Sequence, residues 1–254
     1  MGDALSLDHE TVAAQTAGRR YAEADPWLAR RAPFIGASEV AAALVAYAPG
    51  TRPPGPLYAH LDAPTYVREA AARVAVQTRS RVVTVPLFVA RKAGYRKPQR
   101  SSDAMSRGTR READLIATWW ERQSDCAHRL ALPPRNVLPL KDGPSHRTRL
   151  SCTPDAWALS LFDELIVIEA KCPRTHYEAS DPLPWWWRVQ VQAQIAVCDA
   201  FAGVLVCGPG WGASDGVNTD PISWSVERDD SEIEEIRRVS AMAAMDMDIL
   251  IEEA

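Results

Sequence analysis

Residues 153–171, TPDAWALSLFDELIVIEAK, decide the fold of this chain. An apolar run follows the Pro-Asp pair, a short polar segment turns the chain, and four apolar residues lead back into Glu169, Ala170 and Lys171. This pattern predicts a β-hairpin whose second strand is buried on both faces. Because side chains alternate along a strand, Glu169 and Lys171 should share one face, and the hairpin should bring Asp155 beside Glu169. Such a group could hold a hard divalent cation and the water that it activates.

The Glu-x-Lys pattern alone is weak, since ordinary composition produces it about once in a chain of this length. It also suits a solvated helix face or the frayed end of a strand. The buried strand before Glu169 favours the site, because charges at the end of such a strand need partners.

Composition predicts one domain over residues 1–254. The hydrophobic fraction of 46% supports a sizeable core, and the charged fraction of 24% is ordinary for a soluble protein. No apolar stretch is long enough to cross a membrane, and the N-terminus lacks the pattern of a secretory signal, so we expect a cytoplasmic protein without membrane contact. The net charge of −4 argues against a generally basic DNA-binding surface but leaves a local groove open.

The five cysteines are odd in number and form no Cys-x-x-Cys pair. This spacing speaks against a zinc ribbon or an iron–sulfur cluster. Free thiols in a reducing cytoplasm are the simpler interpretation.

Helices and strands are expected to alternate around one central mixed sheet, which indicates an α/β fold. Ser38 should cap the helix that follows it. The expected helices cover residues 8–31, 39–47, 87–94, 105–122 and 185–197, with a C-terminal helix from about 229. The expected strands, besides the hairpin, cover residues 136–140, 147–151, 202–207 and 222–226.

The helix over 105–122 places Glu112 on the stripe that faces the core, in line with Gly108 and Trp119. Glu112 could serve a site there, or it could lie at the edge of the stripe and pair with an arginine. Both interpretations stay open at this point.

The helix over 185–197 carries three glutamines after three consecutive tryptophans. Gln190 and Gln194 share a face, while Gln192 lies elsewhere. The tryptophans suit packing better than a stacking surface for DNA, although both are open.

Five short motifs follow one another along the chain: Trp27-x3-Arg31-x6-Ser38, Arg107-Gly108-x3-Glu112, Thr153-Pro154-Asp155, Glu169-Ala170-Lys171-Cys172-Pro173, and Gln190-Val191-Gln192-x-x-Ile195-x-Val197. In this order, they resemble the lambda-exonuclease-type (YqaJ-like) viral recombinase family of PD-(D/E)XK nucleases. The resemblance covers most of residues 25–230, and five motifs in the family's order make chance a poor explanation.

The resemblance implies a restriction-endonuclease-like core, a central mixed β-sheet flanked by helices. It implies that Asp155 and Glu169 bind Mg²⁺, which Mn²⁺ could replace, with the carbonyl of Ala170 as a further ligand. Lys171 would position or activate the attacking water and stabilise charge in the transition state. Glu112 would complete the acidic cluster near a second metal position.

The same resemblance implies a catalytic contribution from Gln190 and a 5′-phosphate site at Arg31 and Ser38. A helix N-terminus at Ser38 agrees with anion binding. The activity implied is Mg²⁺-dependent 5′-to-3′ resection of linear double-stranded DNA, which leaves 3′ overhangs for phage-type recombination. The implied partners are DNA ends, further copies of the chain in a homo-oligomeric ring (trimer or tetramer), and a single-strand annealing protein. The resemblance places the protein in a prokaryotic cell, with the gene carried by the host or by a phage.

The chain departs from the family pattern in three places. Ala156 replaces the usual glycine after Pro-Asp, and tryptophans replace tyrosines before the glutamine helix. Residues 50–85 are expected to form an insertion, which could change the size of the ring. Besides an exonuclease, the sequence leaves two other functions open. A DNA endonuclease of the same fold would need no phosphate site, and a catalytically silent DNA-binding protein should have lost a ligand.

Overall fold

The computed structural model describes residues 34–47, 103–122, 129–131, 138–139, 149–173, 176–208 and 220–252. The expected helices over 8–31 and 87–94, the insertion at 50–85 and Arg31 lie outside the described residues. The chain divides into two compact units, one formed by residues 1–98, 142–150 and 235–254 and the other by 99–141 and 151–234. The single domain stays a prediction.

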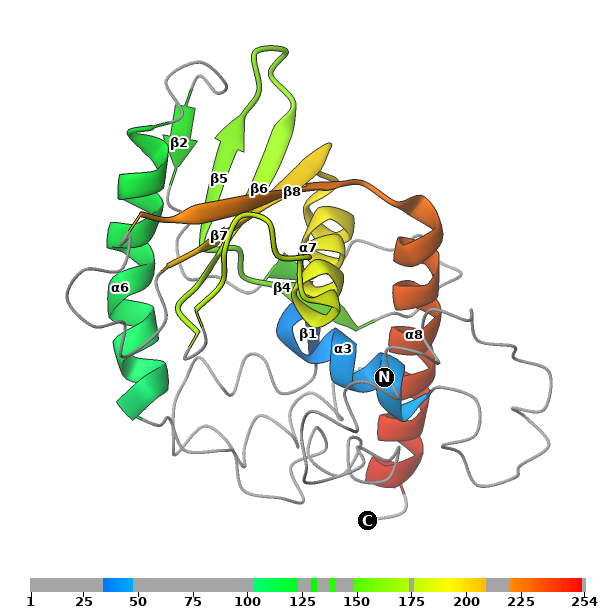
Figure 1. The fold of residues 1–254 in the computed structure, drawn as a ribbon. Coiled ribbons are helices and arrows are strands. Elements are labelled where there is room, and N and C mark those ends of the chain that lie inside the picture. Colours follow the sequence, from blue (N-terminus) through cyan, green and yellow to red (C-terminus); the bar gives the residue numbers. More distant parts are fainter. Residues whose placement is uncertain are drawn as a thin grey trace, which may run out of the picture. The chain divides into compact units, whose positions relative to one another are not determined.

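The second unit is built on a mixed five-stranded sheet in the order β2-β5-β6-β7-β8 (Figure 1). The pair β6–β7 is parallel, and the other three neighbouring pairs are antiparallel. The expected mixed α/β architecture is therefore confirmed. The elements of this unit are α6 (Asp103–Trp120), β2 (Arg129–Ala131), β3 (Leu138–Pro139), β5 (Ala156–Leu159), β6 (Leu165–Lys171), α7 (Trp185–Cys198), β7 (Ala202–Cys207) and β8 (Ile222–Glu227).

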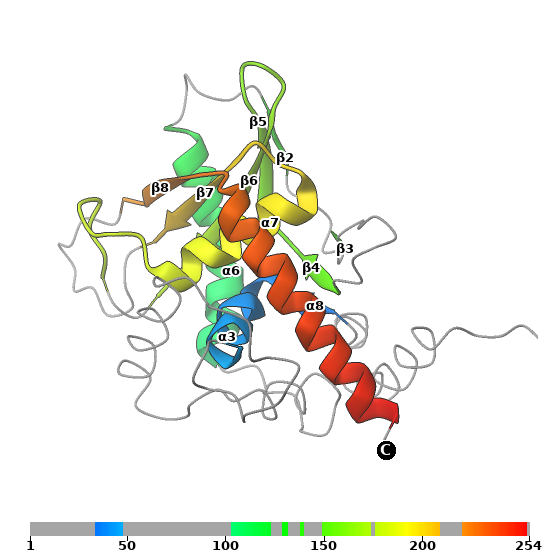
Figure 2. The same ribbon diagram turned by 90° about the vertical axis from the view of Figure 1, so that its right-hand side faces the viewer.

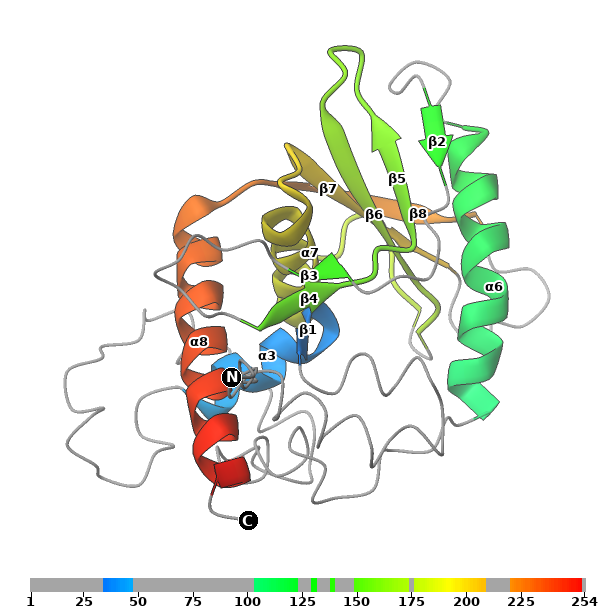
Figure 3. The same ribbon diagram turned by 180° about the vertical axis from the view of Figure 1, so that it is seen from behind.

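The two faces of the sheet are covered by different helices (Figures 2 and 3). Ile168 and Ala170 on β6 pack in one core cluster with Leu115 and Ile116 of α6. Val167, the residue before Ile168, packs in the other cluster with Val191 and Ile195 of α7. This is the alternation that a strand buried on both faces produces. It places Glu169 and Lys171 on the α7 side.

Gly203 on β7 allows α7 to pack closely against the sheet. A Cβ atom at this position would lie 2.3 Å from Cγ1 of Val191 and 3.2 Å from Cγ2 of Val167. Both valines are fully buried. Only glycine leaves room for this approach, so Gly203 helps to fix the distance between α7 and the sheet.

Most predicted elements are present, with shifted ends. The helix expected over 105–122 begins two residues earlier and ends two residues earlier, and the strand over 202–207 has the predicted bounds. The helix expected over 185–197 extends to Cys198. Strand β2 was not expected; its three residues are too short to give an alternating pattern.

In the first unit, α3 (Ala37–Ala46) follows β1 (Ile35–Gly36). The prediction that Ser38 caps this helix is wrong, since Ser38 is already the second helical residue. Instead the N–H of Gly36 donates to Oε2 of Glu39 at 2.8 Å, so the acidic side chain satisfies an amide that the helix leaves unpaired.

Helix α8 (Asp230–Glu252) begins one residue after the expected position, and its residues from Glu235 belong to the first unit. Its C-terminal half is tied there by Tyr47, whose hydroxyl donates to Asp246 at 2.5 Å, and by Arg149, whose Nη2 donates to Asp248 at 2.7 Å. Among the described helices, none has the length and apolar character of a membrane span.

Candidate active site

The predicted hairpin forms and brings Asp155 to the end of β6. Residues Ala156 to Leu159 pair antiparallel with Leu165 to Ile168. The N–H of Asp155 donates to the carbonyl of Ile168 at 3.1 Å, and Oδ2 of Asp155 accepts from the N–H of Ala170 at 2.8 Å. Asp155 lies just before β5, and its carboxylate accepts a hydrogen bond from the backbone of β6. This hydrogen bond fixes the carboxylate beside Glu169.

Glu169 is the most constrained carboxylate of the cluster, with a side chain 5% exposed. Its Oε1 accepts from the ammonium of Lys171 and from Nε2 of Gln190, the latter at 2.5 Å. Its Oε2 accepts from Nε2 of Gln194, also at 2.5 Å. These donors hold a charged group in the protein interior, which would otherwise be costly.

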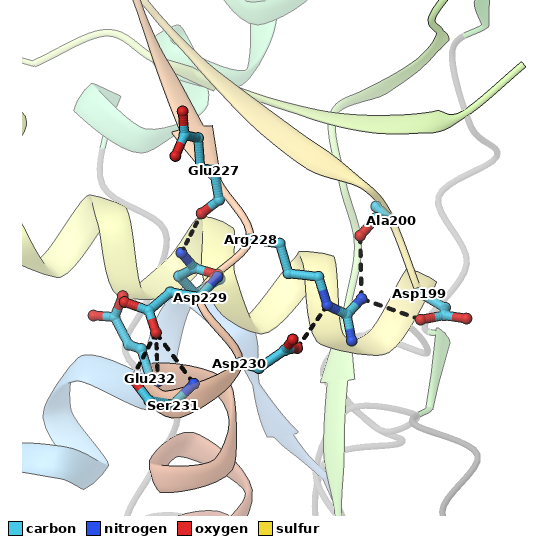
Figure 4. A network of polar contacts seen from close by, with 9 residues as sticks. Asp199, Ala200, Glu227, Arg228, Asp229, Asp230, Ser231 and Glu232 are labelled. Carbon is cyan, nitrogen blue, oxygen red and sulfur yellow. Dashed lines mark hydrogen bonds and ion pairs between the residues drawn. The ribbon is translucent and has the colours of Figure 1, made fainter. Parts of the chain in front are cut away.

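Helix α7 supplies the two amides because Gln190 and Gln194 are one turn apart and face β6. Gln192 points elsewhere, as expected. Its Nε2 donates to the carbonyl of Glu227 at 2.7 Å and its Oε1 accepts from the N–H of Asp229 at 3.2 Å, so it ties α7 to the segment before α8 (Figure 4). Two glutamines therefore serve the cluster, and the third serves the fold.

The cluster has two acidic groups that repel each other. Burial, then the charge of Glu169, raises the pKa of Asp155 to about 8; the charge of Glu112 acts in the same direction. For Lys171, burial favours the neutral amine, but the charge and hydrogen bond of Glu169, with the charges of Asp155 and Glu112, raise its pKa above the ordinary value. Lys171 is therefore a cation at neutral pH.

Glu112 acts on this cluster from α6, on the other side of the sheet from α7. It is partly buried, and the neighbouring residues Leu115, Ile116 and Trp119 form the buried stripe predicted for this helix. Its charge raises the pKa values of both Asp155 and Lys171. The interpretation as an acidic member of the site thus has electrostatic support.

The donor set fits Mg²⁺. Among the residues that the structure describes, no group of three or more His, Cys, Asp or Glu side chains is arranged to hold a metal ion. However, Mg²⁺ is commonly held by one or two carboxylates, with water and substrate phosphate completing the shell. Asp155 and Glu169 provide two such carboxylates, and the repulsion that raises the pKa of Asp155 would be relieved by a divalent cation.

Of the three tryptophans before the glutamines, Trp187 packs as the sequence favours. Trp187 packs against the core under α7, and its ring centroid lies 5.1 Å from that of Tyr177. Tyr177 also contacts Trp224, whose indole N–H donates to the carbonyl of Asp181 at 2.9 Å. These rings hold the start of α7 and thereby the orientation of Gln190.

The predicted roles of two further site residues, Arg31 and Ser38, are not tested by the described structure. Arg31 lies outside the described residues. Ser38 is exposed in the first turn of α3 and belongs to the other compact unit. Their 5′-phosphate site stays a prediction.

Gln194 has a role that the sequence does not predict, as a hydrogen-bond donor to Glu169. Its spacing of four from Gln190 was visible, and on a helix that spacing places two side chains on one face. What the sequence did not provide was the direction of this face, which depends on how α7 packs on β6 and β7. Gln194 is 1% exposed and its amide is committed to Glu169.

The sequence matches no protein-family model and no curated protein. Solved structures do resemble it. The alkaline exonuclease LHK-Exo from Laribacter hongkongensis has a TM-score of 0.56 at 20% identity, over 89% of this chain and 94% of that one. LHK-Exo in complex with dAMP gives 0.57 at 17% identity, over 94% of both chains. A phage-related exonuclease from Haemophilus somnus 129PT gives 0.51 at 12% identity, over 87% of this chain and 96% of that one.

These likenesses extend over most of each chain, although the sequences have diverged far. At such identities they establish the fold. The chain has the fold of these exonucleases, as its resemblance to the lambda-exonuclease-type (YqaJ-like) family predicts.

Proposed function

We propose that this protein is a metal-dependent deoxyribonuclease, an exonuclease that degrades one strand of linear duplex DNA from its 5′ end. The observation that carries the proposal is the cluster of Asp155, Glu169 and Lys171 at the end of one strand, on a fold shared with exonucleases. The order Pro-Asp, then Glu-x-Lys, is that of the PD-(D/E)XK nucleases. The complex of LHK-Exo with dAMP, a DNA mononucleotide, supports DNA as the substrate.

In this proposal Asp155 and Glu169 hold Mg²⁺, for which Mn²⁺ could substitute. When bound, the cation would lower the pKa of a water molecule and offset charge on the scissile phosphate. The protein's own contribution is to fix the carboxylates. Asp155 is held by the N–H of Ala170, and Glu169 is held by Gln190 and Gln194. The carbonyl of Ala170 and the side chain of Glu112 are proposed as additional ligands, Glu112 near a second metal.

Lys171 is assigned to charge stabilisation. Its raised pKa keeps it protonated at neutral pH, so it can donate to a phosphate oxygen on which negative charge develops. An ammonium group cannot take a proton from water, although it can orient the water by donating a hydrogen bond to the water oxygen. The side chain of Lys171 is 24% exposed, so solvent reaches part of it.

Selection of a strand end would come from Arg31 and Ser38, proposed to bind the 5′-phosphate. The products would be 3′ single-stranded overhangs, which serve homologous recombination by single-strand annealing. The proposal includes a homo-oligomeric ring of three or four subunits around DNA, an annealing protein as partner, and action in the cytoplasm of a prokaryotic cell. These parts rest on the family resemblance.

The test compares linear duplex carrying 5′-phosphates with covalently closed circular duplex, both with Mg²⁺. We expect loss of the linear DNA only, early release of a label placed at the 5′ end, and retention of a label at the 3′ end of the same strand. EDTA should abolish the reaction. Early release of the 3′ label would contradict the polarity.

The same experiment separates the competing functions. Cutting of the closed circle would contradict an exonuclease and support an endonuclease of the same fold, the second candidate. Binding of DNA without degradation of either substrate, under Mg²⁺ and under Mn²⁺, would support a silent DNA-binding protein. The presence of all of Glu112, Asp155, Glu169 and Lys171 favours catalysis over this last function.

A further inference from the structure

Two cysteines far apart in sequence are in contact beside the candidate site. The Sγ atoms of Cys152 and Cys198 lie 3.6 Å apart, and the residues are 46 positions apart in the chain. Both belong to the unit that carries the sheet. A disulfide needs a separation of about 2.05 Å, so the sulfurs would have to approach by roughly 1.5 Å. Rotation of side chains and small shifts of backbone can supply a movement of this size.

The two thiols differ in access and in acidity. Cys152 is 3% exposed, whereas Cys198, the last residue of α7, is partly exposed. The hydrogen bond with Cys152 lowers the pKa of Cys198 against the effect of burial. The hydrogen bond to Cys198, followed by burial, raises the pKa of Cys152. The accessible sulfur is therefore the more nucleophilic one, with a second thiol behind it.

The surroundings hold both partners in place. Cys152 is on β4 (Leu150–Cys152) and pairs with Leu138 of β3. Just beyond Cys198, Arg228 donates to Oδ1 of Asp199 at 3.1 Å and to the carbonyl of Ala200 at 3.2 Å, which anchors the end of α7 (Figure 4). The two sulfurs are therefore held in contact by β4 and by the anchored end of α7.

We infer that Cys152 and Cys198 form a modification site, a reversible intramolecular disulfide made by reaction with a peroxide. The Cys198 thiolate attacks one peroxide oxygen, which breaks the O–O bond and leaves a sulfenic acid and hydroxide. The sulfur of Cys152 then attacks the sulfenic sulfur, which forms the S–S bond and breaks S–O. The two thiols supply two electrons, their two protons end in two water molecules, and a dithiol reductant reverses the reaction.

The disulfide would connect the two elements that supply the candidate site. Strand β4 leads through Thr153 and Pro154 into Asp155, and α7 carries Gln190 and Gln194. Because the geometry is nearly formed, the bond stabilises this arrangement and closes a loop of 46 positions in the unfolded chain. This inference is independent of the proposed nuclease function.

The experiment oxidises the full-length native protein with a small excess of hydrogen peroxide, blocks remaining thiols under denaturing conditions, and maps peptides by mass spectrometry. We expect a linked peptide that contains Cys152 and Cys198, and a fall of two in the number of free thiols. The midpoint of thermal unfolding should rise by about 5–15 °C. Dithiothreitol should return both measurements to their starting values.

Three variants make the test specific. Cys198→Ser should lose the linked peptide and the rise in midpoint. If serine at position 198 disturbs folding, Cys152→Ala provides the same test and should also lose both effects. Cys172→Ser is the matched control, because Cys172 is also partly exposed, and it should keep both effects. The inference is overturned if native oxidation links other cysteines, links two chains, or stops at sulfinic acid without a bridge between Cys152 and Cys198.

Discussion

The residue on which the proposed chemistry depends most directly is Lys171. Lys171→Ala removes the ammonium that contacts Glu169 and leaves the backbone of β6 unchanged. We expect cleavage to fall by a factor of roughly 100 or more, since charge stabilisation in a shielded site carries a large share of such reactions. Binding of DNA in EDTA should change little. The measurements are a cleavage assay with labelled duplex and a binding titration.

Glu164→Gln is the matched control for Lys171→Ala. Glu164 also carries a charge near β6, but it lies beside the hairpin turn at the other end of the strand, where its N–H donates to Oγ of Ser160. This variant should cleave at nearly the wild-type rate. Near-normal cleavage by Lys171→Ala would instead show that the site has been wrongly assigned.

Gln194 should contribute to stability more than Gln190 does. Gln194→Met keeps a similar volume but leaves Oε2 of buried Glu169 without this donor, at an expected cost of about 1–2 kcal/mol. The loss is limited because Oε1 of Gln194 has no hydrogen-bond partner among the described residues, so methionine also removes one unsatisfied atom. Gln190→Met should cost less than about 1 kcal/mol, because water can reach the partly exposed position.

Urea unfolding of both glutamine variants, with cleavage assays alongside, tests this order. We expect both variants to lose activity, since each removes one of the donors that fix the direction of the Glu169 carboxylate. Equal stability losses would show that burial at Gln194 is not what makes the difference.

At the level of single residues, the sequence was informative about chemistry and less so about geometry. Alternation along a strand was enough to put Glu169 and Lys171 on one face. It could not predict that the N–H of Ala170 holds Asp155, because that bond depends on how Pro154 directs the chain into β5. For the same reason Gln194 was recognised as a neighbour of Gln190 but not as a partner of Glu169.

At the level of elements, Gly203 sets how closely α7 approaches the sheet. Gly203→Ala introduces a Cβ that would lie 2.3 Å from Cγ1 of Val191, which cannot be accommodated without movement. We expect a loss of about 1–3 kcal/mol in the free energy of unfolding. Because α7 carries Gln190 and Gln194, cleavage should also fall. Urea unfolding and the cleavage assay measure the two effects.

A double variant and a second glycine distinguish crowding from other causes. Val191→Ala should restore much of the stability lost in Gly203→Ala, since it removes the atom nearest to the new Cβ. Gly208→Ala should cost less, because its Cβ would lie 3.3 Å from the nearest atom, on the side chain of Leu115. Additive losses in the double variant would contradict the packing argument.

The elements themselves were predictable where they are long and regular. The helices α6 and α7 and the strands β6 and β7 are long enough to leave a recognisable pattern in the sequence, which in β6 and β7 is a continuous apolar run. Strand β2 has three residues, and its pairing with β5 decides that it is a strand. The start of α3 was misjudged because Ser38 is a good capping residue by type, whereas Glu39 satisfies the free amide of Gly36 from within the helix.

At the level of the whole molecule, the order of strands in the sheet follows from connections that the sequence does not specify alone. The unit β6–α7–β7 is a parallel pair joined by a helix, which alternation of strand and helix predicts. The placement of β8 beside β7 and of β2 beside β5 depends on which edges the connections leave open. The carboxylate cluster then affects the stability of the unit that carries the sheet, because Asp155 is buried there with a strongly raised pKa.

Stability without metal should therefore fall as the pH rises from about 4 to about 8. The pKa of Asp155 is about 8 in the folded chain, while an unfolded aspartate titrates near 3.9. Between these values the folded state binds the extra proton, so ionisation destabilises it by up to about 1.4 kcal/mol per pH unit; the effect is absent below the window and complete above it. Urea unfolding in EDTA at pH 5 and pH 8 measures the loss of stability, and Asp155→Asn should show a smaller loss.

Mg²⁺ at pH 8 should stabilise the wild type and have little effect on Asp155→Asn. Equal pH dependence in the two proteins would show that Asp155 ionises freely in the fold, and Mg²⁺ would then have no buried repulsion to relieve.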